Sequence, residues 1–149
     1  MTSKLKYVRG CGNVEYAGMN AFQYCDELIS VDFSKKLKTV STFFNKCPKL
    51  KYIGDISNVD TFDPVNGSAG GIIRQSGLEK IYMPKLSTIP IKAFYLNSNL
   101  KDLTLDWKNI TSIEQTAFGI DANEYKNMVI RIESIPSLPN LISLGFGAF

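Results

Sequence analysis

Three cysteines are the side chains whose chemistry is easiest to name in this sequence. They stand at positions 11, 25 and 47, and the chain contains no histidine. Without histidine, Ser-His-Asp and Cys-His nucleophilic systems and most zinc sites are excluded. Cys25 and Cys47 form either a disulfide or two buried thiols that pack as small apolar residues. We favour the thiols, because a free cysteine packs as a hydrophobe and a later copy of the same position carries Asn97.

No other pattern indicates catalysis or a bound cofactor. The sequence has no Cys-x-x-Cys, no phosphate-binding glycine loop and no paired-carboxylate motif. Asp60, Asp63 and Asn66 stand at threefold spacing, which is not the spacing of a calcium-binding loop. We therefore predict a protein that is not an enzyme, with no catalytic residue, no metal and no cofactor.

The elements that position all other side chains are copies of one repeat. Phe22-x-x-Cys25-x-x-Leu28 returns 22 residues later at Phe44, and again at Phe94, while a weaker copy begins at Ile72 with Gln75 at the cysteine position. A period in the low twenties is typical of a leucine-rich solenoid, in which one coil is too small to bury its own apolar face. We expect one interior column formed by Leu28, Leu50, Leu78 and Leu100.

Each repeat contains two kinds of local pattern. Val31-x-Phe33 and its copies have the two-residue period of a half-buried strand, so successive copies should pair as parallel strands. Ala21-Phe22 and Ala93-Phe94, each with a small residue four positions after the alanine, predict a short helical turn. The predicted fold class is α/β: a single domain, 1–149, forming a right-handed leucine-rich-repeat solenoid of about six coils, each with one short parallel strand and a short helix or 3₁₀ turn.

With these motifs the chain resembles the leucine-rich repeats of BspA-like bacterial and protist surface proteins. The best matches are the segments 110–118 and 22–31. The resemblance implies recognition rather than catalysis, and an extracellular, cell-surface or virion location. No signal-peptide pattern follows Met1, and no run approaches the roughly 18 apolar residues that cross a bilayer. The chain is either complete or a piece of a longer protein.

Two stretches depart from the repeat. Residues 63–71 are rich in turn-forming residues and lengthen one coil, either as a binding loop or as a tolerated insertion.

Near the end, Leu141-x-x-Leu144 either copies Ile110-x-x-Ile113 or forms a first strand of a new coil. We favour the new strand, because Leu138-Pro-Asn-Leu141 fits the approach to one. Under both interpretations the last coil lacks a polar cap, which predicts self-association or a neighbouring domain at the solenoid ends.

The outer face of the predicted strands supplies the candidate binding residues. They mix tyrosines with charges of both signs: Tyr7, Arg9, Asp32, Tyr52, Lys80, Tyr82, Asp102 and Arg131. Tyrosine and arginine often anchor protein interfaces. The alternative is that these side chains only solvate the sheet. The expected partner is a protein or a surface glycan.

A second candidate surface is a lysine-rich stretch without acidic residues. Its members are Lys35, Lys36, Lys38, Lys46, Lys49 and Lys51. They predict a basic patch, which is either a solvated flank or a contact for an anionic glycan or an acidic partner. The net charge of the whole chain is only +3, so we expect no nucleic-acid binding.

These observations favour a non-enzymatic binding or adhesion module that uses its strand face. The alternative is a structural virion or tail-fibre component, or another assembly subunit, that docks through uncapped solenoid ends. A third hypothesis is a cytoplasmic scaffold.

Overall fold

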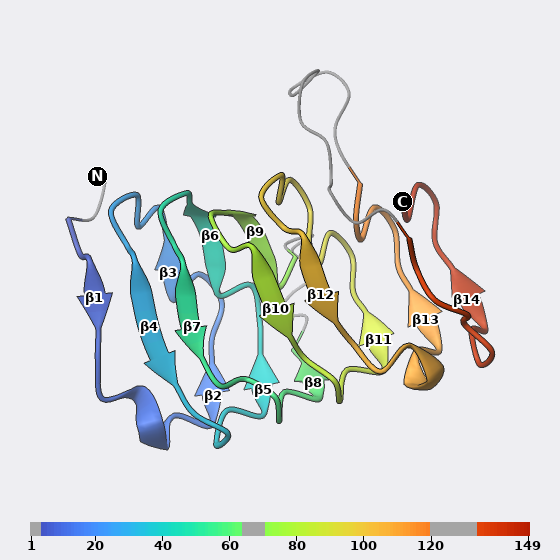
Figure 1. Ribbon diagram of the computed structural model, residues 1–149, viewed down its shortest axis with the longest axis horizontal. Coiled ribbons are helices and arrows are strands. Elements are labelled where there is room, and N and C mark those ends of the chain that lie inside the picture. Colours follow the sequence, from blue (N-terminus) through green and yellow to red (C-terminus); the bar gives the residue numbers. More distant parts are fainter. Residues whose placement is uncertain (1–3, 64–70, 120–133) are drawn as a thin grey trace.

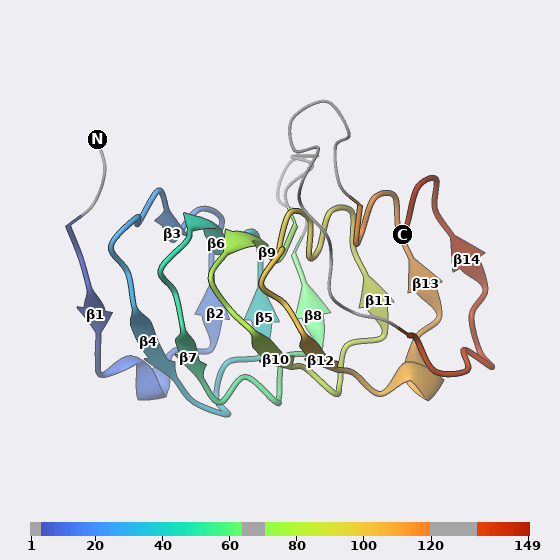
Figure 2. The same ribbon diagram turned by 45° about the horizontal axis from the view of Figure 1, so that its top comes forward.

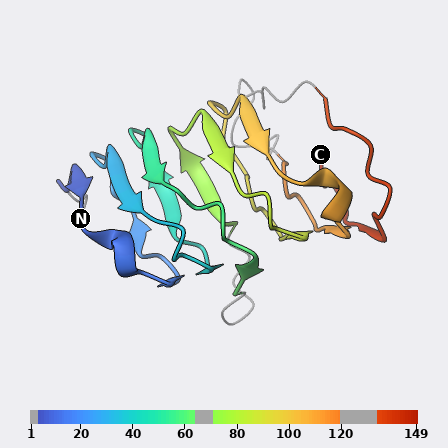
Figure 3. The same ribbon diagram turned by 60° about the horizontal axis from the view of Figure 1, so that its bottom comes forward.

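The structure, a computed structural model, describes residues 4–63, 71–119 and 134–149. In these ranges the chain winds as a solenoid of short parallel strands and contains no α-helix. Figures 1 and 2 show the coils stacked side by side, and Figure 3 shows the same stack from its lower side. Within the described residues there is also no helix long and apolar enough to cross a membrane.

The strands form three rows, one along each side of the solenoid (Figures 1 and 2). The first row contains β1 (Tyr7–Val8), β4 (Ser30–Phe33), β7 (Tyr52–Gly54), β10 (Lys80–Tyr82) and β12 (Asp102–Thr104). The second row contains β2 (Tyr16–Ala17), β5 (Thr39–Val40), β8 (Thr61–Phe62), β11 (Thr88–Ile89), β13 (Ser112–Ile113) and β14 (Ser143–Leu144). The third contains β3 (Phe22–Gln23), β6 (Phe44–Cys47) and β9 (Ile73–Ser76).

Short 3₁₀ helices join the first row to the second in two coils: η1 (Cys11–Asn13) and η3 (Trp107–Asn109). All strand pairs among the described residues are parallel, as the repeat predicts. Between β1 and β12 the chain completes about four turns. The expected number of about six coils is not confirmed by the described ranges.

Among the described residues no helix forms at the Ala-Phe positions, so the predicted α/β class is not confirmed. Single hydrogen-bonded turns do form there, as from the N–H of Tyr95 to the carbonyl of Lys92 at 3.1 Å. Phe22 and Phe44 begin strands β3 and β6 instead. Two residues later, Tyr24 and Lys46 have φ angles of 56° and 59°. A residue in this left-handed conformation ends a right-handed helical turn. The described part of the chain is therefore a β-solenoid.

One apolar core runs through the stack. The leucine column predicted from the sequence is confirmed: each member is at most 2% exposed, and the members are Leu28, Leu50, Leu78 and Leu100. Aromatic rings stack between coils in the same way, with 5.2 Å between the ring centroids of Phe22 and Phe44. Burying a leucine side chain contributes about 1.5–3 kcal/mol. Stacking thus supplies the core that a single coil lacks.

A column of small polar side chains lies beside the leucines. Cys25 and Cys47 are buried free thiols, which confirms the interpretation that we favoured. Asn97 fills the equivalent position and bridges to the preceding coil: its Oδ1 accepts hydrogen bonds from the N–H of Ser76 at 2.9 Å and from the Ser76 hydroxyl at 3.0 Å. Its Nδ2 donates to the carbonyl of Ile73. These side chains satisfy the backbone where each coil turns towards the first row.

The weaker copy of the repeat is shifted by one residue from the predicted alignment. Phe44 pairs with Ile73, not Ile72, and Cys47 pairs with Ser76, so that Gln75 is not at the cysteine position. The sequence does not reveal the shift, because Ile72 and Ile73 are both apolar and either can be matched to Phe44. In the structure both are fully buried.

The prediction for the end of the chain is wrong. Leu144 pairs with Ile113, so β14 belongs to the second row. The N–H of Phe118 likewise donates to the carbonyl of Ala148. The segment 141–149 is therefore a copy of 110–118, and the new first-row strand that we favoured does not exist. The proline between Leu138 and Leu141 suited both interpretations.

Candidate binding groove between β7 and β10

The first row of strands is interrupted between β7 and β10. Strands β1, β4 and β7 form one sheet and β10 and β12 another, and no backbone hydrogen bond among the described residues joins β7 to β10. The second row is interrupted in the same place, between β8 and β11. The third row continues across this point, because β6 pairs with β9. The two halves of the solenoid are thus joined along one side and separated along the strand face.

The turn that leads into β10 is shorter than its equivalents. Two residues separate Cys25 from Leu28, as in two other coils, but Gly77 alone separates Ser76 from Leu78. In the regular turns the leucine N–H donates to the carbonyl three residues before it, as from Leu28 to Cys25 at 3.0 Å. A missing residue shortens an extended chain by about 3.3 Å. Strand β10 therefore begins before the chain has come alongside β7.

Strand β7, in turn, lies tightly against β4. Gly54 has φ 71°, and a Cβ on Gly54 would come within 2.1 Å of the Phe33 carbonyl oxygen. Glycine permits both this backbone conformation and this close approach. The register between β4 and β7 shifts at the same place. Close packing on β4 is consistent with the separation of β7 from β10.

A groove of about 710 Å³ lies along the interruption. Its apolar lining consists of Ile53, Ile56, Leu78 and Ile81, all of them buried. Tyr52 and Tyr82, which are 58% and 54% exposed, line the same groove. The volume lies within the range of about 300–1,000 Å³ that is usual for ligand pockets. The surface combines an apolar floor with an aromatic rim.

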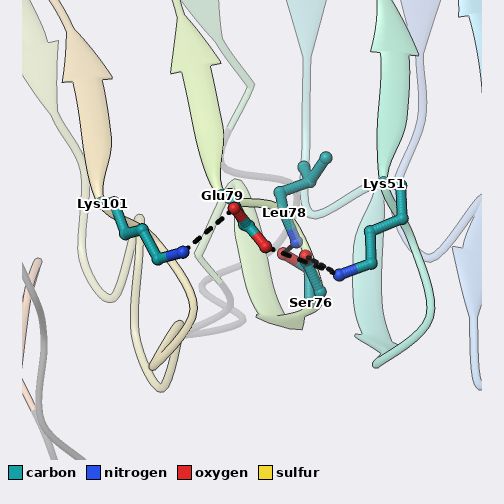
Figure 4. A network of polar contacts seen from close by, with 6 residues as sticks. Lys51, Ser76, Leu78, Glu79 and Lys101 are labelled. Carbon is teal, nitrogen blue, oxygen red and sulfur yellow. Dashed lines mark hydrogen bonds and ion pairs between the residues drawn. The ribbon is translucent and has the colours of Figure 1, made fainter.

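A network of polar contacts lies at the entry to β7 and β10. Glu79 accepts a hydrogen bond from Lys101 Nζ at 3.1 Å, and its other oxygen lies 3.9 Å from Lys51 Nζ (Figure 4). Lys51 also donates to the carbonyl of Gly77 at 3.4 Å. These side chains are about half exposed, so each ion pair contributes little to stability. The two contacts of Lys51 connect the segment before β7 with the segment before β10 across one end of the groove.

The charges that line the groove cancel. Its lining contains three lysines, Lys35, Lys51 and Lys80, and three acids, Asp55, Glu79 and Asp102. Hydrogen bonds from Ser57 lower the pKa of Asp55, and the nearby Lys35 lowers it further. Asp55 is consequently ionised at neutral pH. The groove has no net charge to attract a strongly acidic or strongly basic ligand.

Four of the residues predicted from the sequence line this groove: Tyr52, Lys80, Tyr82 and Asp102. Three others lie in the coils of β1 and β4. The Arg9 guanidinium lies 6.0 Å from the ring centroid of Tyr7, which is 52% exposed. The eighth, Arg131, lies outside the described residues.

Asp32, the third of these, is already engaged within the protein. Its carboxylate accepts hydrogen bonds from the backbone N–H of Cys11 at 3.1 Å and of Gly10 at 3.2 Å. Both bonds lower the pKa of Asp32, the one from Cys11 more than the one from Gly10. The side chain therefore holds the first coil against β4.

The predicted basic patch is divided among different parts of two coils. Lys35, Lys36 and Lys38 follow β4, Lys46 lies in β6, and Lys49 and Lys51 precede β7. Adjacent coils supply partners for most of them: Lys49 lies 2.7 Å from Glu27, Lys36 lies 2.6 Å from the Asn13 side-chain oxygen, and Lys46 lies over the Tyr24 ring. These contacts weaken the positive potential that an acid-free sequence suggests.

Sequence reasoning missed the groove itself and its floor. Leu78 was recognised only as a member of the leucine column, and Ile53, Ile81 and Glu79 were not singled out as candidate site residues. The available signal was the short turn at Gly77. The alignment concealed it, because matching Ile72 instead of Ile73 to Phe44 made the insertion at 63–71 one residue shorter and the turn one residue longer. Residues 64–70 of that insertion lie outside the described ranges, so its predicted binding role is untested.

Stacked coils of parallel strands around a leucine column define this protein as a leucine-rich-repeat solenoid. The family model for the BspA-type leucine-rich repeat region matches in six copies, over residues 1–65 and 70–149. The chain belongs to this family, as its motifs indicated. Searches among curated proteins and among solved structures find no significant match.

Proposed function

We propose that this protein is a recognition or adhesion module that binds another protein through the groove between β7 and β10. Its leucine-rich repeat family suggests protein interaction in general. The single observation that supports this particular surface is the groove, in which two exposed tyrosines stand over an apolar floor.

The chemistry of the rim suits a protein partner. Tyrosine offers a large apolar ring and a polar hydroxyl, and few rotatable bonds must be fixed when it binds. Tyr52 and Tyr82 stand on opposite sides of the groove, on β7 and β10. A partner segment between them would bury both rings, which is the usual position of residues that dominate binding energy.

The proposal is tested by selecting a phage-displayed library of protein fragments and short peptides on the immobilised chain. Selected clones are then measured against a double variant, Tyr52→Ala with Tyr82→Ala. We expect binding at least about tenfold weaker, because loss of a buried interface tyrosine commonly costs more than about 1.4 kcal/mol.

The matched control is Tyr16→Ala with Tyr24→Ala. These tyrosines are 48% and 44% exposed and lie outside the first row. Control binding should equal that of the native chain. Clones that bind both double variants equally well would show that the strand face is not the binding surface. A glycan array, probed in parallel, tests a surface glycan as the partner.

A second candidate function, assembly, is favoured by the last coil. Four large apolar side chains there are exposed: Ile142 (87%), Leu144 (58%), Phe146 (84%) and Phe149 (60%). Exposed apolar groups of this kind often mark protein interfaces. A structural subunit, including one of a virion or tail fibre, would associate through them. Light scattering should then show oligomers that Ile142→Ser with Phe146→Ser reduces to monomers, and a monomeric native chain at high concentration contradicts this function.

A further inference from the structure

We propose that the groove accepts an extended segment of the partner as an additional parallel strand between β7 and β10. This inference rests on the proposed function and specifies its binding mode. The inserted strand would join the two sheets of the first row into one. Its chemistry is that of an extended peptide without large net charge and with apolar side chains at alternate positions.

The first argument is the state of the two strand edges that border the groove. On its other side β7 is bonded to the coil of β4: the N–H groups of Lys51 and Tyr52 donate to the carbonyl of Ile29 at 2.8 and 3.3 Å. Strand β10 is bonded in the same manner to β12. The two facing edges form no ladder with each other. Such edges present rows of backbone groups that can pair with another strand.

The second argument is the arrangement of side chains along the groove. In an inserted strand, alternate side chains point to opposite faces. One set would contact the apolar floor at Ile53 and Ile81, and the other would lie between Tyr52 and Tyr82. Peptide recognition by strand addition combines backbone hydrogen bonds with pockets for alternate side chains in this way. Five residues of extended chain span about 17 Å.

The third argument concerns orientation and charge. Every neighbouring pair in the first row is parallel, so a parallel strand continues the existing pattern. Lys51 and Glu79 meet across one end of the groove, which sets a limit for the inserted segment. The lining charges cancel, and this favours a segment without net charge. A glycan would also stack on the tyrosines, but it offers no regular row of amides for the two edges.

The experiment uses peptides selected from a library of random heptapeptides on the native chain. Each selected peptide is also synthesised with alternate backbone amides N-methylated, in both frames. Residues of an inserted strand direct their N–H groups alternately towards the two edges. We therefore expect both methylated forms to bind at least about tenfold more weakly, because each loses several ladder hydrogen bonds.

Hydrogen exchange supplies a second readout on the native chain. Bound peptide should slow exchange of backbone amides in β10, whereas those of β14, remote in the stack, should be unchanged. Slowed exchange in β10 together with sensitivity to N-methylation supports strand insertion.

The outcomes separate this inference from the proposed function. Peptides that lose affinity for the Tyr52→Ala, Tyr82→Ala variant but tolerate N-methylation overturn strand insertion and leave strand-face binding intact. Peptides indifferent to both tyrosines overturn the proposed function as well. Failure to select any peptide, or binding to glycans alone, also overturns strand insertion.

Discussion

Gly77 lies directly against the backbone of Pro48 in the preceding coil. A Cβ added at Gly77 would come within 2.2 Å of the Pro48 carbonyl oxygen, and the N–H of Gly77 donates to the carbonyl of Cys47 at 3.1 Å. The short turn is thus seated on the regular turn before it. Before this turn the two coils are paired through β6 and β9, and after it β7 and β10 belong to separate sheets.

Replacing Gly77 by alanine should destabilise the protein. The new methyl group meets backbone rather than a flexible side chain, so the coils must move apart. Overpacking of this kind costs about 1–3 kcal/mol in the free energy of unfolding, which urea denaturation measures. Gly12→Ala is the matched control, since a Cβ on Gly12 has no atom within 4 Å. Equal stability of the two variants would show that the turn is not tightly seated.

Asn97→Ala should also lower the free energy of unfolding, by about 1–3 kcal/mol. The substitution removes a buried bridge and leaves polar groups of Ser76 and Ile73 without their partner. Thermal or chemical denaturation provides the measurement. The control is Asn13→Ala, at an exposed side chain whose hydrogen bond is with Lys36. It should change stability by less than about 0.5 kcal/mol. A loss no larger for Asn97 than for Asn13 contradicts the role of the polar column.

Cys11 and Cys47 should differ sharply in reactivity. Burial, more than any other cause, raises the pKa of Cys47 to about 12, so almost no thiolate is present near neutral pH. Cys11 is only partly buried, although burial and then Asp32 raise its pKa as well. Mass spectrometry after brief iodoacetamide treatment should find Cys11 modified first and Cys47 only after unfolding. Rapid modification of Cys47 in the folded chain would contradict its buried position.

Asp32 should make stability depend on pH in the acid range. Its folded pKa is lowered below the ordinary value of 3.8, chiefly by the hydrogen bond from Cys11, so the ionised carboxylate stabilises the fold. That stabilisation is fully present above the unfolded pKa and is lost as pH falls through the folded pKa. Native protein should therefore exceed Asp32→Asn in stability near neutral pH, and the difference should shrink below 3.8. A stability difference between the native protein and Asp32→Asn that stays the same at every pH would exclude this role.

The leucine column and the parallel pairing were predictable because they follow from local spacing repeated along the chain. Each leucine is recognisable from its own neighbours, and stacking is the only way for so short a coil to bury it. The strand-face tyrosines followed from the same period. By contrast, the helix at Ala21-Phe22 was predicted from a spacing that a strand followed by a left-handed residue satisfies equally well.

The groove was not predictable, because it results from a mismatch between two coils rather than from a motif within one. Tyr52 corresponds to Lys80 in the repeat, and Tyr82 stands two residues further along its strand, so the repeat pattern gives no reason to group the two tyrosines. They line one groove because β7 does not pair with β10. The pairing of the lysines at 35–51 was not predictable for the same reason. Its neutralising acids, such as Glu27 beside Lys49, come from other coils.

The sequence by itself determined the family, the parallel pairing of successive coils and the identity of the buried column. A repeated apolar pattern in coils this short can be removed from water only by stacking the coils on one another. Only the tertiary structure decided where the sheet is interrupted, which row the last strand joins and which charges meet. These features depend on differences of one residue between adjacent coils, and such differences acquire meaning only when the coils are placed side by side.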